Sequence, residues 1–193
     1  MNRITREDLM TLEAYAKTRT NFRAQVMEHK RRRRIDLGPN VTLQFEDEFT
    51  MRYQVQEMLR AERIFEERGI QDELDVYNPL VPDGRNFKAT MMIEYPDPSE
   101  RARWLERLIG IEDRVWLQVE GCAKVWPIAD EDLDRETAEK TSSVHFLRFE
   151  LEENMADRLR EGAALAFGID HPNYRADTVA TEEVRDALLR DLA

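Results

Sequence analysis

Alternating hydrophobic and polar residues predict a β-hairpin in the first quarter of the chain. Val41, Leu43 and Phe45 alternate with polar side chains, which is the pattern of a strand with one buried face. The run 31–37 precedes them, and the sequence Gly-Pro-Asn between the two runs is typical of a turn. We therefore expect two antiparallel strands joined by this turn.

A second hairpin and two longer strands are predicted further along. The segments 115–119 and 122–126 both contain apolar residues, and the Glu-Gly pair between them favours a tight turn. The segments 87–95 and 143–151 show the same alternation over a greater length.

Apolar residues spaced three or four apart predict helices elsewhere. Val55 and Leu59 belong to such a stripe, and Gly69 is expected to end their helix. Thr18 and Thr20 are expected to separate the first two helices. The predicted helices cover residues 6–17, 21–29, 53–67, 100–109, 153–161 and 182–192, with a polar helix or loop at 130–140.

Interleaved helices and two tight hairpins predict an α+β fold. We expect one domain over residues 1–193, with a largely antiparallel sheet and two β-hairpins flanked by helices. The chain has no repeat and no long linker. The segment 71–86 is predicted to be a loop, long enough to serve as a lid or a binding loop.

Composition limits the classes of function. The 193 residues include 29 basic and 40 acidic side chains, a formal charge of −11. The single cysteine, Cys122, excludes an internal disulfide and cysteine-based iron–sulfur or zinc sites. No apolar run reaches the roughly 18–20 residues that span a bilayer. We therefore expect a soluble, cytoplasmic protein without a membrane partner.

The run from His29 to Arg34 is the densest basic segment. It could bind the phosphates of a nucleic acid or nucleotide. Alternatively, it could be an edge strand whose charges prevent association between sheets. The acidic remainder of the chain weighs against a nucleic-acid partner.

One face of the helix predicted at 53–67 is a candidate ligand site. Tyr53, Glu57 and Arg60 share this face at helical spacing, and Gln56 is adjacent. A carboxylate beside an arginine and a phenol can bind a polar ligand. The alternative is an ordinary surface ion pair.

His145 is a candidate metal ligand. It alternates with Leu147, Phe149 and Leu151, so its imidazole is expected to point into the core. A buried imidazole needs polar partners, which a carboxylate, a backbone carbonyl or a metal can supply. We predict a divalent metal site of His145 and Glu57, and retain a structurally hydrogen-bonded core histidine as the alternative.

Other catalytic motifs are absent from the sequence. It contains no phosphate-binding glycine motif and no nucleophile elbow. His171 precedes a proline in a predicted turn and is expected to be exposed. Enzyme activity therefore stays undecided.

Four segments together resemble an uncharacterised bacterial family: LGPNVTLQFE at 37–46, YQVQEMLR at 53–60, VPDG at 81–84 and VHFLRF at 144–149. The family is a domain of unknown function of about this length. Its members are often encoded near rubrerythrin-like proteins and iron–sulfur oxidoreductases. The resemblance thus implies a role beside redox or peroxide chemistry, although the chain has no cluster-binding cysteines of its own.

Two hypotheses remain. In the first, the chain is a non-catalytic accessory protein that forms a homodimer or binds a redox partner. Trp104, Trp116 and Trp126 would then be interface anchors, with core packing as the alternative. In the second, the chain is a small-molecule or metal-binding enzyme whose pocket includes Glu57 and His145.

Overall fold

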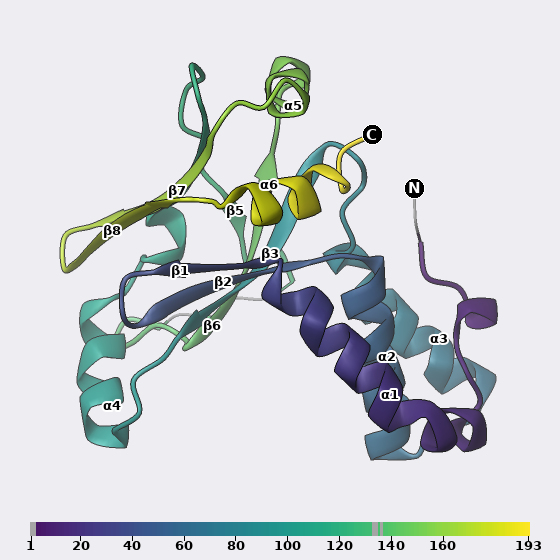
Figure 1. Ribbon diagram of the computed structural model, residues 1–193. Helices are drawn as coiled ribbons and strands as arrows, with labels where there is room; N and C mark the ends of the chain where they lie inside the picture. Colours follow the sequence, from purple (N-terminus) through teal and green to yellow (C-terminus); the bar gives the residue numbers. More distant parts are fainter. Residues whose placement is uncertain (1–2, 133–134, 136) are drawn as a thin grey trace.

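Two antiparallel sheets form the centre of the computed structural model, which describes residues 3–132, 135 and 137–193 (Figure 1). The first sheet has the strand order β1-β2-β3-β6-β5, and the second has the order β4-β7-β8. The strands are β1 (Arg34–Leu37), β2 (Val41–Glu46), β3 (Asn86–Ile93), β4 (Val115–Val119), β5 (Ile128–Ala129), β6 (Val144–Glu150), β7 (Leu165–His171) and β8 (Tyr174–Val179). The predicted α+β fold is confirmed.

Within the described residues, six α-helices surround the sheets, with α1, α2 and α3 gathered at one end and α4 at the other (Figure 1). They are α1 (Leu12–Arg31), α2 (Glu48–Glu62), α3 (Glu67–Tyr77), α4 (Pro98–Arg107), α5 (Glu153–Arg160) and α6 (Glu182–Leu189). Short 3-10 helices cover Arg6–Asp8, Asn78–Leu80 and Glu112–Arg114. None of the described helices is both long and apolar enough to cross a membrane.

The first predicted hairpin is confirmed. Strands β1 and β2 pair from Arg34 with Gln44 to Leu37 with Val41, and Gly38 turns between them with φ +71°. The second predicted hairpin is shorter than expected. Its return segment makes a single bridge, Leu117 to Val125, and β4 pairs instead with β7. Pro127 follows directly and has no N–H for a longer ladder.

The predicted break in the first helix is wrong. Helix α1 continues through Thr18 and Thr20, and the Thr18 hydroxyl donates to the carbonyl of Ala14 within the helix. The helix ends at Arg31, so β1 begins three residues later than expected.

The predicted end of α2 is also wrong. Arg63, with φ 56°, caps this helix, whereas Gly69 lies inside α3. A Cβ at Gly69 would lie 2.7 Å from Cγ2 of Ile64, so this glycine permits close packing rather than ending a helix. Helix α3 also occupies half of the segment 71–86 that was predicted to be a loop. The polar segment at 130–140 lies partly outside the described residues.

The apolar faces of both sheets share one core. Phe45 of β2 packs against Phe87 of β3 and Phe167 of β7, at ring-centroid distances of 6.1 and 5.2 Å. Met155 and Leu188 extend this core to α5 and α6. Helices α2 and α3 bury a separate apolar cluster between them. Helices α1, α2 and α3 thus form a layer beside the sheets. Polar side chains lie where this layer meets the sheets.

Tyr174 links the two sheets. Its hydroxyl donates to the carbonyl of Leu37 at 2.6 Å and accepts from the amide of Asn40 at 3.1 Å. Replacing Tyr174 with phenylalanine is expected to lower the free energy of unfolding by about 1–2 kcal/mol, because two backbone groups lose their partner. Urea denaturation measures the change. Y77F is the control, since the Tyr77 hydroxyl has no hydrogen-bond partner among the described residues; equal losses in both variants would contradict the linking role.

Candidate functional site

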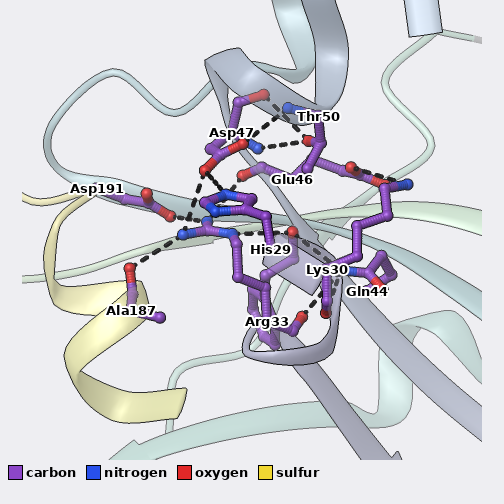
Figure 2. A network of polar contacts seen from close by, with 10 residues as sticks. His29, Lys30, Arg33, Gln44, Glu46, Asp47, Thr50, Ala187 and Asp191 are labelled. Atoms are coloured by element: carbon purple, nitrogen blue, oxygen red, sulfur yellow. Dashed lines mark hydrogen bonds and ion pairs between the residues drawn. The ribbon is translucent and has the colours of Figure 1, made fainter. Parts of the chain in front are cut away.

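A cleft of about 990 Å³ lies where the end of α1, the start of α2, the loop before β3 and the region of α6 meet. Its wall contains a network of polar contacts (Figure 2). Three parts of the chain that are distant in sequence supply this network: residues 29–33, residues 44–50 and residues 187–191.

Arg33 lies at the centre of the network, and its side chain is 2% exposed. The guanidinium donates to the carbonyls of Phe45 and Glu46, both at 3.2 Å, and of Ala187 at 3.0 Å. It also forms an ion pair with Asp191 (Figure 2). Arg33 therefore joins the β2–α2 junction to α6, and its hydrogen-bonding capacity is used within the protein.

Asp47 connects Arg33 to His29. It is the N-cap of α2, and its Oδ1 accepts from the amide of Thr50 at 2.9 Å. Its Oδ2 lies 2.6 Å from Nε2 of His29 and 3.5 Å from Nη1 of Arg33. Burial alone would raise the pKa of Asp47, but the hydrogen bond with His29 and the charge of Arg33 outweigh it and hold this pKa below its ordinary value. Asp47 is thus ionised, and Nε2 of His29 donates to it.

His29 lines the cleft, and its other ring nitrogen is not hydrogen-bonded within the described residues. The side chain is 33% exposed, and its ring lies edge to face against Phe49 at a centroid distance of 5.2 Å. Nδ1 has no hydrogen-bond partner among the described residues. A histidine held by a carboxylate at one nitrogen and open at the other has the arrangement of a general base.

Asp191 is the second carboxyl group on Arg33. Burial, with a contribution from the nearby charge of Asp47, raises its pKa to about 6 in spite of the attraction of Arg33. The pKa values of Asp47 and Asp191 are thus shifted in opposite directions around one guanidinium. Divergent pKa values in neighbouring groups are typical of sites that exchange protons.

Arg190 lies on the same cleft and is exposed. No ion pair of Arg190 occurs within the part of the chain that the structure describes. Arg32, in contrast, forms ion pairs with Glu28 and Glu183. Arg190 is therefore available to bind a negatively charged group of a ligand.

The predicted ligand face on α2 joins that helix to the N-terminal region. Glu57 accepts two hydrogen bonds from Arg19, both at 2.7 Å, and one from Tyr15 at 2.5 Å. Arg19 and Tyr15 together lower the pKa of Glu57 to about 2. Gln56 bonds to the backbone of Met10 through both its oxygen and its nitrogen.

Tyr53 and Arg60 are the other two residues of that face, and neither lines the cleft beside His29. Tyr53 is buried beside Phe22, with ring centroids 6.0 Å apart. Arg60 is exposed and adds its positive charge to the surroundings of Glu57. None of the four residues lines the cleft beside His29. Their role in ligand binding stays a prediction.

His145 points into the core as expected, and it is fully buried on β6. Its partners come from outside the helices: Nδ1 lies 2.6 Å from Oδ2 of Asp130, and Nε2 lies 2.9 Å from the hydroxyl of Thr141. Glu57, in contrast, is bonded to α1. The structure therefore places Glu57 and His145 in separate polar groups and does not bring them together in one site.

His171 is buried, so its predicted exposure is wrong. It is 5% exposed, and Nε2 lies 3.1 Å from the carbonyl of Ile109. The amide of Asn173 donates to Nδ1 at 3.2 Å. The turn at the proline directs this ring toward the α4–β4 connection instead of the solvent.

Comparison with known proteins identifies the family. A family model described as "Protein of unknown function (DUF3501)" matches residues 3–192. The chain belongs to the DUF3501 family. It is also similar to the crystal structure of a novel protein of unknown function from Burkholderia pseudomallei K96243. The sequence identity is 54%, the TM-score is 0.94, and the match covers 99% of this chain and 100% of the other.

Membership of the DUF3501 family confirms the resemblance to a family of unknown function with a bacterial member. No curated protein matches the chain. The proximity to redox genes that the resemblance implied stays a prediction.

The residues of the cleft were only partly visible in the sequence of this DUF3501 chain. His29 and Arg33 belong to the basic run, but Arg33 lies in the turn after α1, so no helical spacing relates the two residues. Arg34 is exposed on β1, an edge strand, as the alternative interpretation of the run expected. Asp47 and Asp191 carried no motif, because their importance depends on tertiary contacts.

Proposed function

We propose that the cleft beside His29 binds a small polar ligand and exchanges a proton with it. The observation that supports this most strongly is the contact of 2.6 Å between Nε2 of His29 and the ionised Asp47, in a residue that lines the cleft and whose Nδ1 has no hydrogen bond within the described residues. Histidine changes charge near neutral pH more readily than any other side chain. The proposed activity is therefore general acid–base chemistry on a bound small molecule.

The residues around the cleft indicate which chemical groups the ligand carries. Nδ1 of His29 would accept a proton from a hydroxyl, ammonium or similar group of the ligand. The carboxylate of Asp47 would stabilise the imidazolium that forms. Arg190 would bind a carboxylate or phosphate group of the same molecule. We expect a metabolite that carries both kinds of group.

The proposal is tested by NMR of the three histidine rings in the full chain. Sugar phosphates, nucleoside monophosphates, hydroxy acids and polyamines are each added at millimolar concentration. At least one of the first three classes is expected to shift the His29 signals, while those of the buried His145 and His171 remain in place. The R190Q variant is expected to weaken the effect at least tenfold, because it removes a charged hydrogen bond.

A matched control is R185Q, since Arg185 lies on α6, which Arg190 caps, but is paired with Asp186. If no compound shifts His29, or if only polyamines do so, the proposal is contradicted. Equal losses in R190Q and R185Q would show that Arg190 does not contact the ligand.

The alternative role as an accessory to a redox protein has one supporting observation. Of the three candidate anchor tryptophans, Trp126 is 46% exposed, whereas Trp116 is 7% exposed and Trp104 stacks on Tyr95. Ile128, close to Trp126 in sequence, is also exposed. A homodimer or a redox partner at Trp126 stays a prediction, and a W126A variant tested for self-association by sedimentation would address it.

A further inference from the structure

A second polar group lies away from the cleft, around the fully buried ring of His145. Glu112, Asp130 and His145 each offer a ligand atom, and these atoms lie within 4.8 Å of one another. Glu112 follows α4 in the 3-10 helix, Asp130 follows β5, and His145 is on β6. Three separate segments therefore converge on one imidazole.

The atoms around Nε2 of His145 suit a metal ion. The hydroxyl of Thr141 lies 2.9 Å from Nε2, the carbonyl of Ser142 lies 3.1 Å away, and Oε2 of Glu112 lies 3.8 Å away. Atoms that bind one ion at about 2.1 Å are separated from each other by roughly 3.0–3.4 Å. Two of the three distances are close to this range, and Glu112 needs to approach by only a few tenths of an ångström.

Asp130 fits the role of the residue that orients a metal-binding histidine. Its Oδ2 accepts from Nδ1 of His145 at 2.6 Å, and its Oδ1 accepts from the amide of Phe146 at 2.8 Å. Arg135 lies 3.2 Å from Oδ1. A carboxylate on the far nitrogen of a ligating imidazole fixes the orientation of the ring and increases its basicity.

The burial and the donor atoms of the group also suit a metal ion. Glu112 and His145 are 6% and 0% exposed, and Asp130 is half-buried. One imidazole with carboxylate, hydroxyl and carbonyl oxygens suits zinc, manganese or iron better than a soft metal ion that prefers thiolate ligands.

We propose that His145 Nε2, Glu112, the Thr141 hydroxyl and the Ser142 carbonyl bind a divalent transition-metal ion, with Asp130 orienting the imidazole. The site is independent of the cleft beside His29, because the two share no residue. It replaces Glu57 of the sequence-based metal site with Glu112.

Titration calorimetry of the tag-free full chain, stripped of metal with EDTA, tests the proposal. Zn²⁺ and Mn²⁺ are added in separate experiments. We expect one ion to bind per chain. E112Q, which removes a ligand charge, is expected to weaken binding at least tenfold. D130N is expected to weaken it by about 10–100-fold, as measured for residues that orient metal ligands.

H171Q is the matched control, because His171 is a buried histidine that contacts a backbone carbonyl instead of a carboxylate. Its affinity is expected to equal that of the wild type. Absence of binding in the wild type, or equal losses in H171Q and E112Q, would overturn the proposal and leave His145 as a buried ring hydrogen-bonded to Asp130 and Thr141.

A measurement on the wild type keeps the test valid if a variant fails to fold. Mn²⁺ broadens NMR signals of nearby amides. The amides of Asp130 and of residues 141–146 are expected to broaden first. If exposed acidic surfaces broaden before them, the ion binds elsewhere and the proposal is wrong.

Discussion

Replacing Arg33 with alanine is expected to lower the free energy of unfolding by about 3–5 kcal/mol, which is the usual cost of removing one partner of a buried ion pair. The guanidinium is 2% exposed and contacts two carboxylates and three backbone carbonyls. Without it, Asp47 and Asp191 lie close together in a buried site without their cation. Urea denaturation at neutral pH measures the change.

The matched control for this prediction is R31A. Arg31 belongs to the same basic run, but its side chain is 79% exposed and pairs with Glu28 within one helix. Such a pair contributes about 0.3–0.5 kcal/mol. Similar losses in R33A and R31A would show that the buried network does not hold α6 against the β2–α2 junction.

The second large effect concerns Asp191 and pH. Its pKa is raised from 3.8 to about 6 in the folded protein. The folded state therefore binds more protons than the unfolded state between about pH 4 and pH 6, and stability from this residue falls as the pH rises through that range. A shift of about two units corresponds to about 3 kcal/mol.

A D191N variant isolates this contribution, because asparagine resembles the protonated acid at every pH. Between pH 4 and pH 7 the wild type is expected to lose up to about 3 kcal/mol of stability through this residue, and D191N is expected to lack that loss. D36N, at an exposed carboxylate of β1, serves as the control and is expected to follow the wild-type profile. Parallel profiles for the wild type and D191N would contradict the raised pKa of Asp191.

The sequence predicts those elements whose pattern is local. Alternation around Val41 and Leu43 located the first hairpin, and alternation around His145 located β6. Predictions failed where tertiary packing decides. Gly69 is typical of a helix end, yet here it accommodates Ile64. Thr18 is unfavourable within a helix, yet its hydroxyl bonds to the preceding turn.

Less of the candidate site than of the fold could be predicted from the sequence. The inward direction of His145 follows from strand periodicity, but its partner Asp130 is fifteen residues away and comes from an irregular segment. Asp191 is separated from Arg33 by 158 positions. A contact between such distant residues has no local pattern, so only the fold identifies the pair.

Asp47 holds Nε2 of His29 and leaves Nδ1 without a hydrogen bond within the described residues, so the tautomer of this ring tests the proposed site most directly. The ¹⁵N chemical shifts of the His29 ring, measured above neutral pH, report which nitrogen carries the proton. A protonated Nε2 and an unprotonated Nδ1 are predicted, with this preference lost in D47N. A proton on Nδ1 in the wild type would contradict this arrangement of His29 and Asp47.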